Sequence, residues 1–369
     1  MIKNTILFLV MTLLLASHKP KEQGLKDIFK DSYHIGVALN RWQVTSDDPK
    51  AKSVIENNFN SLSPENGLKW ERVHPDPDRF NFEFGDEYVA LGEKMRAFTI
   101  GHCLVWHQQV PDWVFEDEVG DLVGKDVLYS RMENHIQTVA GRYKGKINGW
   151  DVVNEAFNED GSFRESKWFQ IAGKDFIKEA FRNAQKADPD AELYYNDYNV
   201  WRASKRKGIL DFAKEMKAEG IKIDAIGMQG HYQLESPTLE EIEQGIIDIH
   251  EAGFKVMITE LDVDVLPRPR RAEGADLNMN FANSDEYNPY KEGITPEAEA
   301  KLAQRYEDIF AIYEKHKDKI TRVTFWGLSD RNSWLNNFPV RGRTNYPLPF
   351  DRNLDPKKEV FEKLAGVVK

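Results

Sequence analysis

The alternation of short apolar segments with longer helix-like segments constrains the fold most strongly. Eight segments have the composition of buried β-strands, namely Tyr33–Asn40, Phe59–Glu65, Ala97–His107, Ile147–Asn154, Glu192–Asn196, Ala225–His231, Lys255–Glu260 and Arg322–Leu328. Parallel strands need helical crossovers, and eight strand–helix units can close a sheet into a barrel. We therefore predict an α/β fold, a single (β/α)8 TIM barrel.

The intervening segments carry apolar residues at helical spacing. Val127, Leu128, Met132, Ile136 and Val139 form one such stripe, and similar stripes lie within residues 176–184, 239–249 and 302–313. An open, doubly wound sheet remains the structural alternative. The sequence lacks G-x-G-x-x-G after the first strand and G-x-x-x-x-G-K-[ST] anywhere, so nucleotide binding has no support.

The charge balance narrows the classes of partner. The 369 residues include 50 Lys plus Arg and 61 Asp plus Glu, which gives a net charge of -11. This acidity argues against nucleic acid or an anionic membrane as the main partner, and it is compatible with a neutral substrate.

The first residues have the pattern of an export signal. Lys3 precedes an apolar run over residues 6–15, and the small residues Ala16 and Ser17 follow. The run is too short to span a bilayer, so we predict a signal peptide at 1–17 and a mature catalytic barrel at 18–369, periplasmic or released and without a membrane anchor. An uncleaved anchor or a buried helix is the alternative. Cys103 is the only cysteine, which excludes an intrachain disulfide.

Polar and aromatic residues gather at the carboxyl ends of the predicted strands, the end at which active sites of this fold lie. The fourth predicted strand, which lies in the motif WDVVNEAF (150–157), is one example, because it ends in the amide of Asn154 and the carboxylate of Glu155. At least seven strands show the pattern, with Glu65, Asn66 and Lys69; His102, Trp106 and His107; Asn154 and Glu155; Asn196, Asp197, Tyr198 and Asn199; Gln229 and His231; Glu260 and Asp262; Trp326 and Trp334.

Glu155 and Glu260 follow strands that can face each other across the barrel. Two facing carboxylates are the groups that glycoside hydrolysis uses, one as acid and the other as nucleophile or base. The alternative is a pair of structural glutamates in salt bridges at the rim. His102 and His107 are five residues apart on a strand and point to opposite faces, and no G-x-S-x-G occurs, so neither a metal site nor an esterase site is predicted. We expect no metal and no cofactor.

Longer motifs carry a family resemblance. SPENGLKW, GHCLVWHQQVPDW, WDVVNEAF, YNDYN, GMQGHY, ITELDV and TFWGLSDRNSWL together resemble family-10 glycoside hydrolases, over about Ile28 to Phe361. The resemblance implies a secreted endo-β-1,4-xylanase on a (β/α)8 barrel. It implies Glu155 as acid/base and Glu260 as nucleophile of a retaining reaction. The two carboxyl groups of retaining enzymes are about 5–5.5 Å apart.

The resemblance also assigns binding roles, with xylan and xylo-oligosaccharides as partners. It places His231 between Glu260 and the supporting Asp262. The other residues that it places against sugar are Glu65, Asn66 and Gln109 on the non-reducing side; Lys69, His102, Trp106, Asn154 and Gln229 around the reacting sugar; Tyr198 and Asn199 on the leaving-group side; and Trp326 and Trp334 as an aromatic roof.

The sequence departs from the family pattern at two places. Gly67 stands where relatives commonly carry Glu, and Leu68 where they often carry Met. The irregular segment from Leu266 to Gly293 is longer than in a minimal relative, and we expect it to border the cleft and to affect longer or branched substrates.

Two rival functions remain open. A β-1,4-glucanase or β-mannanase would share the two glutamates and differ in the pocket beside Lys69, Trp326 and Trp334. A catalytically inactive polysaccharide-binding protein would retain the cleft without turnover. We expect the protein to be a monomer.

Overall fold

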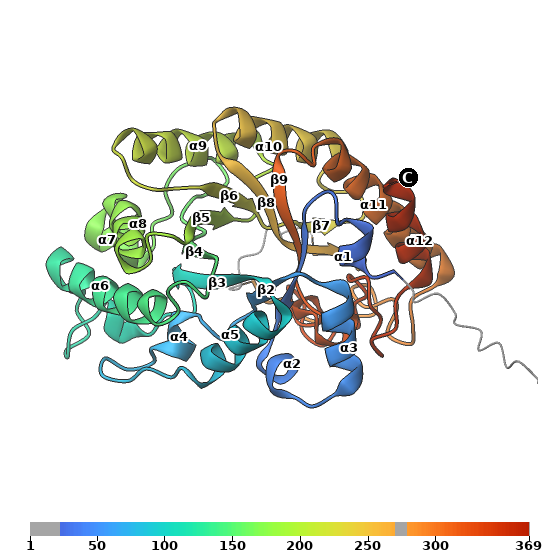
Figure 1. Ribbon diagram of the computed structural model, residues 1–369, viewed down its shortest axis with the longest axis horizontal. Helices are drawn as coiled ribbons and strands as arrows, with labels where there is room; N and C mark the ends of the chain where they lie inside the picture. The colour runs from blue at the N-terminus through green and yellow to red at the C-terminus, as the bar shows by residue number, and fades with distance from the viewer. Residues whose placement is uncertain (1–22, 270–278, 369) are drawn as a thin grey trace, which may run out of the picture.

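The computed structural model describes residues 23–269 and 279–368, and its strands form a closed parallel barrel. Neighbouring strands pair in the order β6-β5-β4-β3-β2-β1-β9-β8, and a β6–β8 pairing closes the ring (Figure 1). The barrel strands are β1 His34–Leu39, β2 Ser61–Pro64, β3 Phe98–Val105, β4 Gly149–Asn154, β5 Glu192–Asp197, β6 Ala225–Met228, β8 Lys255–Asp264 and β9 Ile320–Phe325. The predicted (β/α)8 barrel is therefore confirmed.

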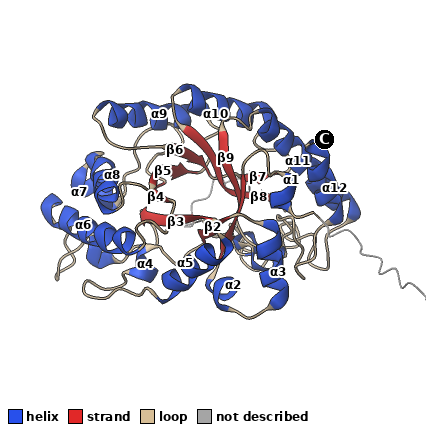
Figure 2. Ribbon diagram, in the orientation of Figure 1, coloured by secondary structure: helices blue, strands red, loops and turns tan. Residues whose placement is uncertain are grey.

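Helices surround the barrel as an outer ring (Figure 2). The longer ones are α3 Pro49–Asn58, α5 Glu83–Met95, α6 Lys125–Arg142, α8 Asp175–Ala187, α9 Ala203–Ala218, α10 Leu239–Glu251, α11 Pro296–Lys315 and α12 Lys358–Val367. Short helices are α1 Leu25–Ile28, α2 Arg41–Thr45, α4 Trp70–Val73 and α7 Lys167–Ala172. The four apolar stripes seen in the sequence lie in α6, α8, α10 and α11, and each turns buried residues toward the barrel. Val127, in the first turn of α6, is the exception, because it is exposed.

The sixth predicted strand is wrong in one respect, because it is two strands. β6 ends at Met228, and β7, His231–Gln233, begins after a break at Gly230, whose φ is +88°. The seventh predicted strand is correspondingly longer, since β8 continues to Asp264 and pairs with β7 in the register His231↔Asp262. This extra pairing places a histidine directly beside a carboxylate.

Glycines on the barrel strands make room for large side chains of the adjacent strand. A Cβ on Gly101 of β3 would overlap the ring of Trp150 of β4, and one on Gly149 of β4 would overlap Tyr194 of β5. Gly36 and Gly227 stand in the same relation to Thr324 and Asn196. The interior is thus filled by alternating small and large residues, as a closed eight-stranded barrel requires.

Two predicted segments extend outside the described residues. The predicted signal peptide, residues 1–17, lies wholly outside them, and the long segment after β8 lies outside them at residues 270–278. In the described part of that segment, Asn283 Nδ2 donates to Gly342 O and Asn288 Oδ1 accepts from Thr344 N, so it packs against the chain that follows β9. No helix within residues 23–269 and 279–368 is long and apolar enough to cross a membrane.

We predict that Gly101→Ala lowers the free energy of unfolding by about 1–3 kcal/mol, because the added methyl group displaces Trp150 in a packed interior. Urea denaturation should show a lower midpoint with an unchanged slope. Gly141→Ala is the matched control: nothing lies within 4 Å of its Cβ position, on α6, and we expect stabilisation of about 0.4–1 kcal/mol. Equal effects at the two sites would contradict this account of the core.

Candidate active site

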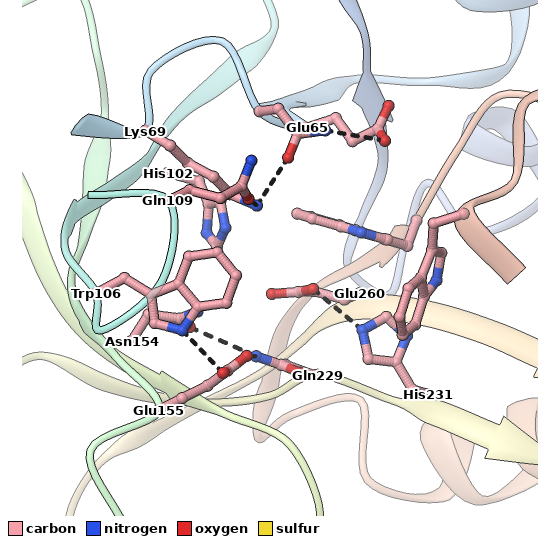
Figure 3. Close-up of a pocket in the computed structure, with 13 residues that line it drawn as sticks. Glu65, Lys69, His102, Trp106, Gln109, Asn154, Glu155, Gln229, His231 and Glu260 are labelled. Carbon is pink, nitrogen blue, oxygen red and sulfur yellow. Dashed lines mark hydrogen bonds and ion pairs between the residues drawn. The ribbon is translucent and has the colours of Figure 1, made fainter. Parts of the chain in front are cut away.

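One cavity at the carboxyl ends of the barrel strands gathers most of the predicted site residues (Figure 3). Its lining consists of Glu65, Asn66, Lys69, His102, Trp106, Gln109, Asn154, Glu155, Gln229, His231, Glu260, Trp326 and Trp334. All 13 were singled out from the sequence as catalytic or sugar-binding candidates. Six barrel strands, or the turns directly after them, contribute these side chains.

Glu155 follows β4 and turns into the cavity from a backbone with φ +58°. Trp106 Nε1 donates to its Oε2 at 2.8 Å, and Gln229 Nε2 donates to its Oε1 at 2.9 Å. Burial raises the pKa of Glu155, and the nearby charges of Asp197 and Glu260 raise it further, against the lowering effect of the two hydrogen bonds. Glu155 is therefore the carboxyl group that holds a proton more readily.

Glu260 lies on β8 and has a different environment. Asn196 Nδ2 donates to its Oε1 at 2.7 Å, and His231 Nε2 lies 3.1 Å from its Oε2. Burial by itself would raise the pKa of Glu260, but the hydrogen bond from His231 and the positive charges of His231, His102 and Lys69 outweigh it and lower that pKa. Glu260 is thus kept as a carboxylate.

His231 connects Glu260 to a second carboxylate. Its Nδ1 lies 3.0 Å from Oδ1 of Asp262, and Trp334 Nε1 donates to the other oxygen of Asp262 at 2.7 Å. Burial disfavours the imidazolium, but the two flanking carboxylates raise the pKa of His231 to about 9. At neutral pH, therefore, a cationic His231 stands between two anionic groups, and Asp262 supports Glu260 through it.

Lys69 organises the side of the cavity where Glu65 also lies. Its Nζ donates to Asn66 Oδ1 at 2.9 Å and to Gln109 Oε1 at 3.0 Å, and it lies 4.5 Å from the centre of the Trp106 ring. The ammonium and the two amides can donate to sugar hydroxyls, while the indole offers an apolar face. This combination suits a pyranose, which has both kinds of surface.

His102 and Asn154 are oriented by residues behind them. His102 Nδ1 donates to Asp151 Oδ2 at 2.9 Å, which leaves Nε2 as the ring nitrogen that can meet a ligand. Asn154 Oδ1 accepts from Asn196 Nδ2 at 2.9 Å, which presents the Nδ2 group of Asn154 as a donor. These two side chains are therefore held in one orientation before a ligand arrives.

Tyr198 and Asn199 do not line this cavity, although both were predicted to contact substrate. Arg164 donates to the Tyr198 hydroxyl at 2.7 Å and to the backbone oxygen of Glu155 at 3.1 Å. Asn199 Nδ2 lies 3.3 Å from the carboxylate of Glu159. Both residues thus lie beside the turn that carries Glu155, and their role on the leaving-group side stays a prediction.

Two residues of β5 were noted at the end of their strand in the sequence but were not assigned a role in the site. Asn196 donates to both Asn154 and Glu260, so it links the two strands that carry the glutamates. Asp197 is buried between Lys205 at 2.8 Å and the Tyr195 hydroxyl, and its charge acts on Glu155. Their position at the end of the fifth strand was the available signal, because every neighbouring strand ends in a site residue.

The geometry separates the protonation states of two carboxyl groups that share one cavity. A protonated Glu155 can donate a proton, and an ionised Glu260 can attack an electrophilic carbon or activate water. Within residues 23–269 and 279–368 we find no group of three or more His, Cys, Asp and Glu residues that could hold a metal ion. The chemistry that these residues support is acid and nucleophilic catalysis at a glycosidic bond.

We predict that the His231 ring titrates near pH 9, so that it is an imidazolium at neutral pH. Asp262→Asn should lower this pKa toward the ordinary value of about 6.5, because it removes one of two flanking negative charges. A ¹⁵N NMR titration of labelled histidines measures both values. Asp211→Asn, which removes an exposed carboxylate on α9, is the control. A neutral His231 ring at pH 7 in the unaltered protein would contradict the assignment.

Comparison with known proteins places the chain in a family. The model of glycosyl hydrolase family 10 matches residues 24–365. Endo-1,4-beta-xylanase A of Xylanibacter ruminicola is 45% identical over 353 residues, 96% of each chain. An endo-1,4-beta-xylanase of Geobacillus stearothermophilus is 40% identical over 340 residues, 90% of this chain and 96% of the relative.

Solved structures agree with these matches. A GH10 endoxylanase retrieved from a sugarcane soil metagenome superimposes with a TM-score of 0.88 at 45% identity, covering 94% of this chain and 100% of the other. A xylanase of Paenibacillus barcinonensis, in complex with a conduramine derivative, gives a TM-score of 0.83 at 35% identity, covering 94% and 99%. The chain belongs to glycosyl hydrolase family 10.

Proposed function

We propose that this protein is an endo-1,4-β-xylanase that cleaves internal β-1,4-xylosidic bonds of xylan with retention of configuration. The observation that carries the proposal is the pair of buried glutamates, Glu155 and Glu260, whose surroundings shift their pKa values in opposite directions within one cavity. Family membership and the xylanase names of the similar proteins support the substrate class.

The reaction proceeds in two displacements. A carboxylate oxygen of Glu260 attacks the anomeric carbon, while the proton of Glu155 passes to the leaving glycosidic oxygen. The Glu260 ester of the sugar forms, and the aglycone departs. Glu155, now a carboxylate, takes a proton from water, whose oxygen attacks the same carbon and releases Glu260. Two inversions restore the original configuration.

The supporting residues act on particular steps. His231 and Asn196 both donate to Glu260, which holds the nucleophile in place and keeps it ionised until it attacks. The Nδ2 group of Asn154, oriented by Asn196, is placed to bond a sugar hydroxyl. Such a bond can strengthen as the ring approaches an oxocarbenium ion, and it then contributes to the rate.

Reducing-sugar release from soluble xylan, carboxymethyl-cellulose and mannan, assayed in parallel, tests the proposal. We expect strong release from xylan, and a loss of at least about 10⁴-fold in Glu260→Ala because the nucleophile is absent. Glu155→Ala should lose far less on aryl xylosides with a good leaving group than on xylan, since those need little protonation.

Preference for cellulose or mannan would overturn the substrate assignment and leave the mechanism intact. Binding of polymer without turnover would instead favour a non-catalytic binding protein. Equal losses of activity in Glu155→Ala on xylan and on aryl xylosides would contradict its role as the acid.

The pH dependence should follow the two shifted carboxyl groups. At low pH, activity falls as Glu260 is protonated, and the lowered pKa of Glu260 shifts this acidic limb of the profile to lower pH. At high pH, activity falls as Glu155 ionises, and the raised pKa of Glu155 shifts this alkaline limb to higher pH. Asp197→Asn removes a negative charge that raises the pKa of Glu155, so the alkaline limb should move to lower pH.

Profiles of kcat/KM against pH measure both limbs. Asp211→Asn should leave both in place, because this carboxylate is exposed on α9. An alkaline limb that stays in place in Asp197→Asn, with the fold intact by circular dichroism, would contradict the electrostatic account of Glu155.

We also propose that the protein is exported, periplasmic or released, and acts as a monomer. The apolar run at residues 6–15, followed by Ala16 and Ser17, supports export.

A further inference from the structure

A second cavity adjoins the one that holds the glutamates. It measures about 290 Å³, against about 210 Å³ for the first, and Asn66 lines both. Asn40 follows β1, Arg41 begins α2, Arg72 lies on α4, and Asn81 lies just before α5. The second cavity therefore extends the cleft on the side of Asn66, which the family resemblance assigns to the non-reducing end of the substrate.

This second cavity is cationic in an acidic protein. Arg41 donates to Glu83 at 2.6 Å, so its charge is largely balanced. Arg72 is exposed on α4, and within residues 23–269 and 279–368 its guanidinium has no hydrogen bond or ion pair. Although the chain carries a net charge of -11, this wall of the cleft therefore presents a solvent-accessible guanidinium that no carboxylate neutralises.

The departure of the sequence at Gly67 helps to form this cavity. A Cβ at position 67 would overlap the ring of Phe84, which is buried beside it and also lines the cavity. Glycine is thus required for Phe84 to lie here. A longer acidic side chain at position 67 would displace this ring and bring a negative charge close to the arginines. The cavity therefore combines an apolar wall, amides and positive charge.

We infer that the second cavity binds the carboxylate of a uronic acid attached as a side group to the xylan chain; this rests on the proposed xylanase function. Unsubstituted xylose residues are neutral and do not require a guanidinium. A carboxylate matches the planar, two-pronged donor face of Arg72, and the amides of Asn40 and Asn81 can bond the hydroxyls of the same side group. The substituted xylose would lie at, or beyond, the position next to Asn66.

Matched oligosaccharides test this inference with the full mature protein. Three substrates of equal backbone length are needed: one unsubstituted, one with a uronic acid side group toward its non-reducing end, and the same compound with its carboxyl group reduced to an alcohol. The kcat/KM ratio of acidic to reduced substrate isolates the charge. Arg72→Gln should lower this ratio about fivefold to tenfold, and salt should lower it in the unaltered protein. Arg182→Gln, on the outer helix α8, should leave it unchanged.

The outcomes separate the two proposals. The uronic acid site would be overturned if the ratio of kcat/KM on acidic to reduced substrate were the same in the unaltered protein, Arg72→Gln and Arg182→Gln. Cleavage of the unsubstituted substrate would in that case still support the xylanase function. An equal loss in Arg72→Gln on the acidic and reduced substrates would also overturn it, since the cavity would then recognise shape and not charge. No cleavage of any of the three by the unaltered protein would reject the proposed function itself.

Discussion

The ion triad of Glu260, His231 and Asp262 is the interaction on which the site depends. A buried carboxylate is costly unless a charge or donors compensate it, and an imidazolium between two carboxylates supplies both. Because this arrangement keeps Glu260 ionised, the other glutamate in the cavity, Glu155, is the one that burial and negative neighbours bias toward protonation. The division of roles follows from surroundings, since the two side chains are chemically identical.

The barrel creates the triad through a detail of its pairing. β8 runs beyond the point at which β6 ends, and the short strand β7 pairs with this extension in the register His231↔Asp262. Gly230, at φ +88°, provides the break that separates β6 from β7. On the other side, Asn196 of β5 reaches both Asn154 and Glu260, so the strands that carry the two glutamates are linked through side chains as well as through the closed sheet.

Much of this could be predicted from the sequence, for identifiable reasons. The strands and helices could be predicted because buried parallel strands are continuous apolar runs and helices such as α6 carry apolar residues at a 3.6-residue spacing. The lining of the main cavity could be predicted because active sites of a barrel lie at the carboxyl ends of its strands and because the family motifs fall there. The break between β6 and β7 could not be predicted, because it depends on pairing with a strand about 30 residues away. The second cavity could not be predicted either, since its lining comes from α2, α4 and other segments that the fold alone brings together.

The same limits explain the remaining differences. The position of Asn196 and Asp197 at the end of the fifth strand was visible in the sequence, but their roles were not, because side-chain bonds across the barrel leave no pattern along the chain. Tyr198 and Asn199 came from motif matching alone, and the structure places them beside the Glu155 turn and outside the main cavity. Motifs locate residues near a site, whereas contact with a ligand depends on the geometry of neighbouring loops.

The most direct test of the account is the protonation order of the two glutamates. Carbon-13 NMR of side-chain-labelled glutamate, titrated with pH and assigned by Glu155→Gln and Glu260→Gln, reports each carboxyl group separately. The account predicts that Glu155 titrates above the ordinary glutamate range and Glu260 below it, so that at neutral pH any proton shared by the pair resides on Glu155. A higher pKa on Glu260 than on Glu155 would contradict it.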